Sequence, residues 1–271
     1  MKTILITGAA SGIGKATAIL FSENGWNVVA AMRNIEKCPE LSERRNIKTL
    51  YIDVKDRKSI DYCIEQTISD FGKIDAVVNN AGIYITDPLE LSSDDDIENL
   101  VRTNIIGTIS VTKAILKHFR ENKAGVIVNV SSIAGRVTFP FQSVYHTSKW
   151  AIEGMSESLL YELKPLNIKV KIIEPGMVKT HLYQSVLNKL ADEYPISYKS
   201  NFKQWHSYLM HNFKNGYSPI LDAKTIYKAV NDNSFKLRYR SDFTTRMVLS
   251  IRSFLGLTLF QSIIKKQSNL R

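Results

Sequence analysis

The sequence predicts an α/β fold in a single domain. Three observations indicate this class. Short runs of β-branched and apolar residues alternate with longer segments of helical periodicity. The first of these runs ends in a glycine-rich turn that opens a helical pattern. At 271 residues, with 23% charged residues and no repeats, the chain has the size and composition of one folded α/β domain.

The first strand is predicted at residues 3–7, directly before the glycine-rich turn. Gly8, Gly12 and Gly14 precede a helical pattern that stops at Gly25. Such a turn brings backbone N–H groups close to a phosphate at a helix amino terminus. We interpret it as a dinucleotide site, because three glycines cost folding entropy that a turn without a ligand does not require.

The same turn is a near match to the P-loop of nucleotide triphosphatases, Gly-x4-Gly-Lys-Ser/Thr. Gly14 and Lys15 fit that pattern. Ala9 and Ala16 stand where it requires glycine and Ser/Thr, so the hydroxyl ligand of Mg²⁺ is missing. The sequence therefore argues against triphosphate hydrolysis.

The second strand, at residues 27–32, ends at Arg33, and residues 28–35 contain no acid. In a dinucleotide fold an acid at this place binds the ribose 2′-hydroxyl, whereas an arginine accommodates a 2′-phosphate. A charge-assisted contact of roughly 1.5–3 kcal/mol predicts a preference for NADP over NAD of about ten- to a hundredfold. The alternative is a solvated surface arginine.

The next segments continue the alternation of strands and helices. A charged connection, a strand, a helix and a strand are predicted at residues 38–46, 47–54, 56–71 and 75–78. Asn79-Asn80-Ala81-Gly82 follows, and its small residues suit the close approach of backbone to a ligand. Ser92 or Ser93 then opens an acidic helix start. Asn104 lies in the middle of that helix, where asparagine is a poor helix former, so we interpret it as functional rather than as an exposed polar residue.

A proton-transfer pair is predicted on a helix at residues 143–163. The strand before it, residues 126–130, ends at a serine pair whose second member is Ser132. Tyr145 and Lys149 lie four residues apart, so phenol and ammonium share one helix face. At about 6 Å and an effective dielectric near 20, the ammonium favours the phenolate by roughly 3 kcal/mol, which lowers the phenol pKa by about two. Such a tyrosine suits proton transfer to a carbonyl that accepts hydride, with Ser132 as a hydrogen-bond donor to the same oxygen.

The spacing of that pair proves little by itself, because Tyr51 and Lys55 form a second copy. The second copy lies in an alternating, strand-like stretch with no serine-ended strand shortly before it. Context therefore favours Tyr145 and Lys149 as the catalytic pair.

The motifs together resemble the short-chain dehydrogenase/reductase family in order and spacing. The matching positions are Thr7-Gly8-x-x-x-Gly12-Ile13-Gly14, Asn79-Asn80-Ala81-Gly82, Asn104, Ser132, Tyr145-x-x-x-Lys149 and, after a strand at residues 168–173, Pro175-Gly176-x-x-x-Thr180. The resemblance covers residues 3 to about 180 and implies a doubly wound, Rossmann-type parallel sheet that binds a nicotinamide cofactor. No chemistry-bearing position departs from the pattern, so we expect a competent enzyme. A catalytically silent, dinucleotide-binding regulator is the alternative.

The resemblance also implies a role for each matching residue. Tyr145 is the acid/base, Lys149 also binds the nicotinamide ribose, Asn104 holds a water that joins Lys149 to solvent, and Asn79 is structural. Asp53 lies against the adenine, although it could equally cap the helix that begins near residue 56. The expected cofactor contacts are Gly8, Ser11, Gly12, Ile13, Gly14, Arg33, Asp53, Val54, Asn80, Ala81, Gly82, Tyr145, Lys149, Pro175, Gly176, Val178 and Thr180.

Residues 180–217 contain eight Phe, Tyr and Trp side chains where the family places a variable helical lid over the substrate. They are Tyr183, Tyr194, Tyr198, Phe202, Trp205, Tyr208, Phe213 and Tyr217. An apolar substrate that carries a ring or a chain suits such a lining. The alternative is that these rings pack the lid itself or a subunit contact.

Residues 241–271 form a basic amphipathic extension beyond the domain of residues 1–240. Apolar residues recur with helical spacing from Met247 to Ile264. Arg252, several hydroxyl residues and Gln261 argue against a spanning helix. The stripe either docks on its own domain or makes a peripheral contact in the plane of an anionic membrane. The extension is similar to that of 17β-hydroxysteroid-dehydrogenase-like members of the family, which favours a steroid-, retinoid- or lipid-like alcohol or ketone.

Composition excludes several classes of partner. Residues 199–271 hold 13 Lys/Arg and 3 Asp/Glu, so the net charge of +10 lies wholly in the last quarter of the chain. These cations alternate with apolar residues and accompany no recognition motif, so we expect no nucleic acid. Two cysteines and five scattered histidines have no metal-site spacing, so we expect no metal. We predict a cytoplasmic, reducing location without a signal peptide, and the resemblance implies a homodimer or homotetramer.

Overall fold

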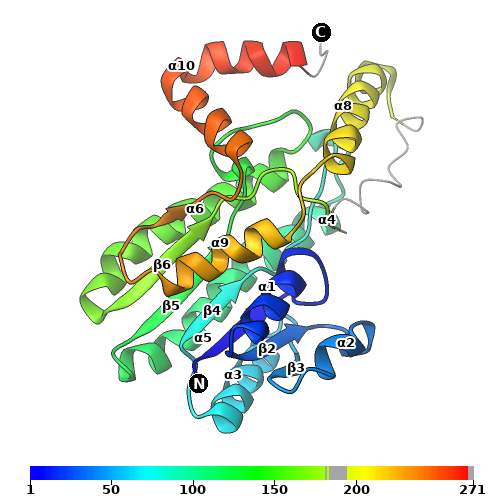
Figure 1. Ribbon diagram of the computed structural model, residues 1–271. Coiled ribbons are helices and arrows are strands. Elements are labelled where there is room, and N and C mark those ends of the chain that lie inside the picture. Colours follow the sequence, from blue (N-terminus) through cyan, green and yellow to red (C-terminus); the bar gives the residue numbers. More distant parts are fainter. Residues whose placement is uncertain (181, 183–193, 268–271) are drawn as a thin grey trace.

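A seven-stranded parallel sheet forms the centre of the computed structural model, which describes residues 1–180, 182 and 194–267 (Figure 1). The strands lie in the order β3-β2-β1-β4-β5-β6-β7. Their bounds are β1 Thr3–Thr7, β2 Asn27–Met32, β3 Ile47–Tyr51, β4 Ala76–Asn79, β5 Gly125–Val130, β6 Ile168–Ile173 and β7 Arg238–Tyr239. The strand order reverses between β1 and β4, which pair with each other, and this is the doubly wound, Rossmann-type arrangement that the resemblance implied.

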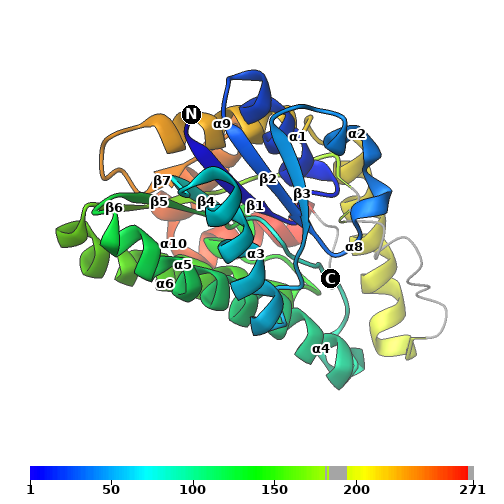
Figure 2. The same ribbon diagram turned by 90° about the horizontal axis from the view of Figure 1, so that it is seen from below.

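Helices cover both faces of the sheet (Figure 2). On one face lie α1 Gly12–Glu23 and α9 Ile220–Asn231, and on the other lie α3 Arg57–Phe71, α5 Gly107–Glu121 and α6 Ser143–Leu163. Three further helices are α2 Pro39–Ser42, α4 Asp94–Leu100 and α8 Ile196–Lys214. The last helix is α10 Phe243–Gln267.

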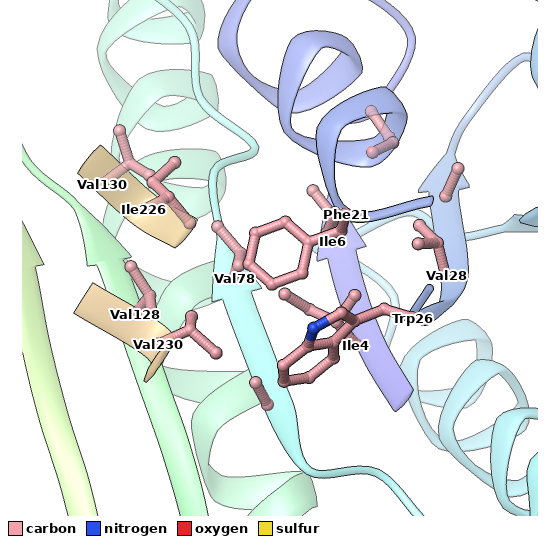
Figure 3. Close-up of a cluster of buried hydrophobic side chains, with 14 of the residues drawn as sticks. Ile4, Ile6, Phe21, Trp26, Val28, Val78, Val128, Val130, Ile226 and Val230 are labelled. Atoms are coloured by element: carbon pink, nitrogen blue, oxygen red, sulfur yellow. The ribbon is translucent and has the colours of Figure 1, made fainter. Parts of the chain in front are cut away.

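The strands are mostly apolar because both faces of the sheet are covered. Successive side chains of a strand point to opposite faces, so Ile4 and Ile6 of β1 pack with Phe21 of α1 and Ile226 of α9 (Figure 3). Leu5, between them, packs into the opposite cluster. Full burial of each such side chain contributes about 1.5–3 kcal/mol to the free energy of unfolding.

Several predicted bounds match the structure residue for residue, including the strands at 3–7, 27–32 and 168–173 and the helix at 143–163. The third strand differs, since it ends at Tyr51 rather than at residue 54. Beyond it the chain turns, and the Asp53 carboxylate accepts a hydrogen bond from the Lys55 N–H at 2.9 Å. Asp56, not Asp53, caps α3, because its carboxylate accepts from the Lys58 N–H.

The helix predicted around Asn104 is not a continuous α-helix. Ser93 caps α4 as predicted, since its hydroxyl accepts a hydrogen bond from the Asp96 N–H at 3.1 Å. A π-helical turn, Val101–Ile106, then separates α4 from α5 and contains Asn104. Such π-turns are rare, and those that occur often lie at functional sites. The poor helix propensity of Asn104 therefore coincides with a real irregularity of the helix.

The C-terminal extension is one bent helix. Its two segments meet at Gly256, where φ is 71° and ψ is −174°, far from helical values. Among the described residues, Phe243–Lys266 is the helix whose length and composition would allow it to cross a membrane. The break at Gly256 gives two shorter segments with different directions (Figure 1).

Candidate active site

A cavity of about 760 Å³ is formed by residues that follow the carboxyl ends of the strands. Parallel strands bring these ends to one edge of the sheet, where open α/β proteins bind ligands. The predicted site residues that line it are Gly8, Ser11, Gly12, Ile13, Arg33, Asp53, Val54, Asn80, Ala81, Gly82, Ser132, Tyr145, Lys149, Pro175, Gly176, Val178 and Thr180. Gly14 and Asn104 lie behind this lining and support it.

The glycine turn is held in place by the segment after β4. The Asn80 amide donates hydrogen bonds to the carbonyl oxygens of Thr7 and Gly8, at 3.0 and 3.1 Å. The Thr7 hydroxyl in turn accepts from the N–H groups of Asn80 and Ala81, each at 3.1 Å. A Cβ atom on Gly14 would stand 2.5 Å from both the Asn80 amide nitrogen and the Gly8 carbonyl oxygen. Only glycine therefore fits at this position.

The amino terminus of α1 is open toward an anion. Its N-cap, Ser11, makes no side-chain capping bond, and its first turn contains no acid. The backbone N–H groups and the positive end of the helix dipole are thus available to a phosphate. Gly8 and Gly12 have φ values of 66° and 54°, the left-handed region that glycine adopts without strain. These residues fit the dinucleotide that the motif predicts.

The segment after β2 places two cations at the cavity. Arg33 is exposed and lines it together with Asn34 and Lys37. The sequence reasoning missed Asn34 and Lys37, although both lie within four residues of Arg33. Two cations of the segment after β2 therefore line the cavity.

Tyr145 and Lys149 lie at the inner end of the cavity, on the first turns of α6. Both are buried, with exposed fractions of 6% and 9%. The Lys149 ammonium nitrogen is 5.8 Å from the centre of the Tyr145 ring and donates a hydrogen bond to the Val130 carbonyl oxygen at 3.0 Å. The edge of the Tyr84 ring packs against Tyr145, with ring centres 4.6 Å apart. The phenol is therefore held in one position by its neighbours.

Burial controls the protonation of this pair, and the direction for Tyr145 differs from the expected one. We expected Lys149 to lower the pKa of the phenol. Instead, burial raises the pKa of Tyr145 to about 12, opposed by a hydrogen bond with Ser132, and lowers the pKa of Lys149 to about 8, opposed by the charge of Glu153. Loss of water disfavours both charged forms, and this effect exceeds the attraction between an ammonium and a phenolate at this distance.

Ser132 lies where β5 ends, close to the phenol. Its hydroxyl oxygen caps the short turn Ile133–Gly135 by accepting a hydrogen bond from the Ala134 N–H at 3.1 Å. The hydroxyl hydrogen remains able to donate to a substrate oxygen. Ser132 and Tyr145 thus converge on one point from β5 and α6, as the sequence reasoning predicted.

Asn104 joins the π-turn to the two segments beside it. Its amide oxygen accepts from the Ile83 N–H at 2.8 Å, and its amide nitrogen donates to the Ile83 carbonyl at 2.9 Å and to the Ser148 hydroxyl at 3.1 Å. The side chain therefore fixes the loop after Gly82 and the residue next to Lys149. The water that the resemblance assigns to Asn104 stays a prediction.

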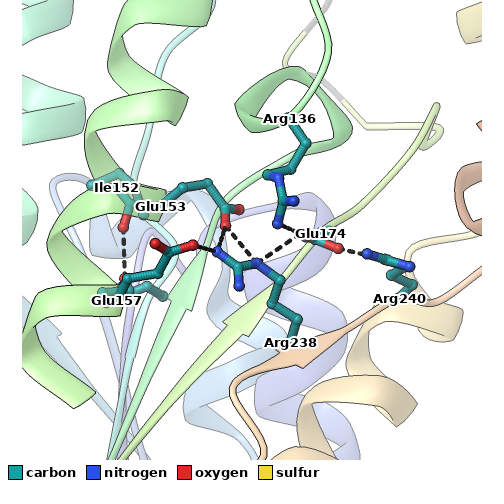
Figure 4. A network of polar contacts seen from close by, with 9 residues as sticks. Arg136, Ile152, Glu153, Glu157, Glu174, Arg238 and Arg240 are labelled. Carbon is teal, nitrogen blue, oxygen red and sulfur yellow. Dashed lines mark hydrogen bonds and ion pairs between the residues drawn. The ribbon is translucent and has the colours of Figure 1, made fainter. Parts of the chain in front are cut away.

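An ion-pair network supports the catalytic helix from behind (Figure 4). Glu153, one turn after Lys149, accepts a hydrogen bond from Arg238 at 3.0 Å. Arg238 also pairs with the fully buried Glu174 at 3.3 Å, and Arg240 and Arg136 pair with Glu174 at 2.6 and 3.7 Å. The network links α6, β7, the turn after Ser132 and the loop that begins at Pro175. Sequence reasoning missed it, because its members are far apart in the chain.

The loop at residues 174–180 is tied to the segment after α8. The Gly176 N–H donates to the Tyr217 hydroxyl at 3.1 Å. The Tyr217 N–H donates to the Met177 carbonyl at 3.1 Å, and the Lys179 N–H donates to the Tyr217 carbonyl at 2.9 Å. Three hydrogen bonds to Tyr217 therefore hold the loop that the resemblance places over the nicotinamide.

The other wall of the cavity is largely apolar. It is formed by side chains from the loop after β4, from residues 139–142, from Met177 and from α8, namely Tyr84, Ile85, Phe139, Gln142, Met177, Leu209 and Phe213. Phe202 and Trp205 are fully buried on the inner side of α8 and do not line the cavity. Both readings of the aromatic segment thus hold in part, because Phe213 faces the cavity while Phe202 and Trp205 pack the lid. Tyr183 lies outside the described residues.

Comparison with known proteins agrees with this geometry. The family model described as short chain dehydrogenase matches residues 2–191. An uncharacterized oxidoreductase of Schizosaccharomyces pombe is 35% identical over 239 residues, which are 88% of this chain and 100% of the relative. A 3-ketodihydrosphingosine reductase of Bacteroides thetaiotaomicron is 39% identical over 183 residues, which are 66% of this chain and 65% of the relative.

A solved structure shares the fold. The structure of ElxO with NADP bound aligns with a TM-score of 0.76 and 30% sequence identity, covering 91% of this chain and 99% of ElxO. The seven-stranded sheet and its flanking helices are therefore an arrangement that also occurs with a nicotinamide dinucleotide bound.

Proposed function

The chain belongs to the short-chain dehydrogenase family and is a dehydrogenase or reductase; from this premise we propose that it interconverts a ketone or aldehyde and an alcohol on an apolar small molecule with NADP(H). One observation carries the proposal: Ser132, Tyr145 and Lys149 line the same cavity as the glycine turn. The uncapped helix amino terminus after that turn leaves backbone N–H groups available to bind a phosphate. A bound nicotinamide would supply the hydride. The chain's own residues hold the dinucleotide, orient the carbonyl and move one proton.

Each catalytic side chain has a distinct task in the reductive direction. Ser132 and Tyr145 hydrogen-bond the carbonyl oxygen and so stabilise the charge that develops there as the carbon accepts hydride. The Tyr145 hydroxyl then transfers its proton to that oxygen, which yields the alcohol. In oxidation the Tyr145 oxygen, as the phenolate, accepts the alcohol proton while the hydride leaves the carbon for the nicotinamide. The cavity excludes water from this step, because Tyr145 is 6% exposed.

Lys149 has two tasks in this proposal. Its hydrogen bond to the Val130 carbonyl aims the ammonium at the cavity, where it can reach a nicotinamide ribose. Its pKa of about 8 lies near neutral pH, so it can return a proton to Tyr145 during each cycle. Asn104, hydrogen-bonded to Ser148, lies beside this route and would hold the water that joins Lys149 to solvent.

Arg33 and Lys37 support a preference for NADP(H), since both cations line the cavity after β2. The apolar wall supports an apolar substrate. A relative named for reduction of 3-ketodihydrosphingosine points to the same chemical class. We place the chain beside the 17β-hydroxysteroid-dehydrogenase-like members, with a steroid-, retinoid- or lipid-like alcohol or ketone as substrate.

We propose a cytoplasmic homodimer or homotetramer built on the helices that carry Asn104 and Tyr145. Large apolar side chains near the start of these helices are exposed in the single chain, among them Ile106, Ile109 and Trp150. A subunit contact would cover them. The domain division at residue 240 and the lid at residues 180–217 belong to the same proposal.

A turnover assay tests the proposed function against its alternative, a silent dinucleotide-binding regulator. A panel of apolar ketones and alcohols is assayed with NADPH and NADP⁺, and binding of NADPH is followed in parallel by its fluorescence. Turnover of at least one pair in both directions is expected. Tight NADPH binding with no turnover across the panel would support the silent regulator instead.

A further inference from the structure

The helix α10 presents a group of exposed apolar side chains on both sides of its break at Gly256. We call this group the α10 ridge; its members are Met247, Phe254, Leu257, Leu259 and Ile263. Phe254 is 93% exposed, Leu259 57% and Leu257 51%. Scattered exposed apolar residues are ordinary, but a contiguous group on one helix marks an interaction surface.

The second segment of α10 is held in a fixed orientation by Phe260, which packs on the domain between Leu257 and Ile263 of the ridge. Phe260 is 3% exposed and packs with Ile133, Val137 and Leu249. Residues four apart share a helix face, so Phe260 and Ile264 form the docked row. Part of the stripe therefore docks on its own domain, as one reading of the sequence expected. The ridge is what that docking leaves uncovered.

The docked row rests on the wall of the substrate cavity. Ile133 and Phe139 belong to the cluster around Phe260, and both also line the cavity. Figure 1 shows the second segment of α10 running across this side of the molecule toward α8, the helix that carries Leu209 and Phe213 of the apolar wall. The ridge thus stands beside the part of the protein that receives the substrate.

The charged residues of α10 indicate which kind of partner the ridge binds. Residues 243–267 contain four cations, Arg246, Arg252, Lys265 and Lys266, and no acid. A second copy of this chain, docked symmetrically on the ridge, would bring these cations against themselves. A surface with negative charges outside and an apolar interior beneath them is complementary both to these cations and to the exposed apolar side chains of the ridge.

A helix that spans a bilayer does not fit the observed shape. The helix is long enough only when Phe243–Lys266 is continuous, and Gly256 breaks it. The docked row also keeps Leu249 and Phe260 against the domain. The remaining geometry is a helix lying in the plane of the interface, with its apolar row inserted at the boundary of headgroups and acyl chains.

We infer that the α10 ridge is a docking surface for an anionic lipid bilayer, and that docking brings the apolar wall of the cavity to the lipid phase. The claim that docking brings the cavity to the lipid phase rests on the proposed function, because a substrate that dissolves in lipid would then reach the cavity without crossing water. The claim that the α10 ridge docks on an anionic bilayer is independent of catalysis.

Co-sedimentation of the full chain with vesicles tests the surface. Vesicles of phosphatidylcholine alone are compared with vesicles that also contain phosphatidylserine. The full chain is expected to pellet with the anionic vesicles and to be released by salt. Phe254→Ser with Leu257→Ser should lower the partition coefficient at least tenfold. Lys265→Gln with Lys266→Gln should lower it by about thirtyfold, at roughly fivefold for each cation near an anionic surface.

The control is Tyr161→Ser, which removes an aromatic ring that is 79% exposed on α6 and should leave pelleting unchanged. Equal pelleting of the full chain and the Phe254→Ser, Leu257→Ser variant would overturn the inference. So would a dimer that this variant dissociates without any pelleting of the full chain, since the partner would then be a second copy. Turnover of a water-soluble ketone without vesicles is measured on each variant. In the Phe254→Ser, Leu257→Ser variant, lost pelleting with intact turnover is the expected result. In the wild-type chain, turnover without any pelleting sinks the docking surface alone, and pelleting without turnover of any ketone sinks the proposed function alone.

Discussion

The two walls of the cavity are built from different kinds of contact. The cofactor wall follows β1, β2 and β4, and hydrogen bonds hold it, such as those from the Asn80 amide to the carbonyl oxygens of Thr7 and Gly8. The substrate wall comes from the loop after β4, from residues 139–142, from Met177 and from α8, and apolar side chains such as Leu209 and Phe213 form it. Hydrogen bonds require particular atoms at particular distances, whereas apolar packing requires volume and shape.

This difference decides what each wall can recognise. A wall of backbone N–H groups and glycines accepts one kind of ligand, an extended phosphate-bearing molecule. A wall of apolar side chains discriminates weakly between substrates of similar size, because one methylene changes binding by only about 1–3 kcal/mol. Changes to the first wall should therefore act on the cofactor, and changes to the second should act on the choice of substrate.

The largest effect is expected where the two walls meet. Tyr145→Phe removes the hydroxyl that transfers the proton and keeps the buried ring against Tyr84. We expect kcat to fall by about a thousandfold, within the range known for loss of a general acid. NADPH fluorescence titration should show unchanged affinity. Retention of more than a tenth of the wild-type kcat would show that another group supplies the proton.

A second effect at the same place concerns pH. The pKa of Lys149 is lowered from 10.5 in the unfolded chain to about 8 in the folded protein, so between these values the unfolded chain binds more protons. The free energy of unfolding should therefore rise with pH across this interval, by up to about 3 kcal/mol from this one group. Lys149→Met should remove that rise and stabilise the protein at pH 7.

Urea unfolding between pH 7 and pH 10.5 measures this slope. Lys171, whose pKa burial also lowers to about 8, contributes in both proteins, so only the difference between them is interpreted. Lys113→Met changes an exposed lysine on α5 and should leave the slope as it is. An equal slope in wild type and Lys149→Met would show that the ammonium is not desolvated.

The third effect tests the cofactor wall after β2. Arg33→Asp replaces an exposed cation at the cavity by an acid that suits a ribose hydroxyl. The ratio of kcat/KM for NADPH over NADH should fall by about ten- to a hundredfold. Arg45→Asp, on an exposed residue that does not line the cavity, is the matched control. An unchanged ratio would reduce Arg33 to a solvated surface residue.

The fourth effect tests the tightest point of that wall. Gly14→Ala places a methyl group 2.5 Å from the Asn80 amide nitrogen and the Gly8 carbonyl, so the turn must shift. NADPH affinity should fall at least tenfold, or about 1.4 kcal/mol. Gly154→Ala adds the same methyl group to α6, where nothing lies within 4 Å, and should slightly stabilise the helix without changing affinity. Equal affinity in both variants would show that the turn does not cradle the dinucleotide.

The same difference between local patterns and packing separates the features that could be predicted from the sequence from those that could not. The residues of the cofactor wall and the pair Tyr145 and Lys149 could be predicted to line one cavity, because the expected chemistry needs fixed residue types at fixed spacing, as in Gly8, Gly12 and Gly14. The position of Asn104 was visible as a conflict with helix propensity, and the π-turn explains that conflict. Strand bounds were visible because buried parallel strands are continuous apolar runs.

The missed features depend on contacts between distant residues. Glu153 and Arg238 are 85 positions apart, and no local pattern indicates that they meet. Desolvation of Tyr145 likewise depends on the whole surrounding fold, so the expected direction of its pKa was wrong although its neighbour was identified. Which rings of the lid face the cavity also depends on how α8 packs, and composition does not contain that information.

The smallest effect belongs to the substrate wall. Leu209→Ala removes a fully buried side chain that lines the cavity and should lower the free energy of unfolding by about 2–5 kcal/mol. The vacated space should raise kcat/KM for a bulky ketone relative to a small one by about tenfold and leave NADPH affinity unchanged. Leu163→Ala, in the core on the side of α6 away from the cavity, should cost similar stability without changing this selectivity. If the two variants shift selectivity equally, the effect comes from general loosening of the domain, and α8 does not shape the substrate site.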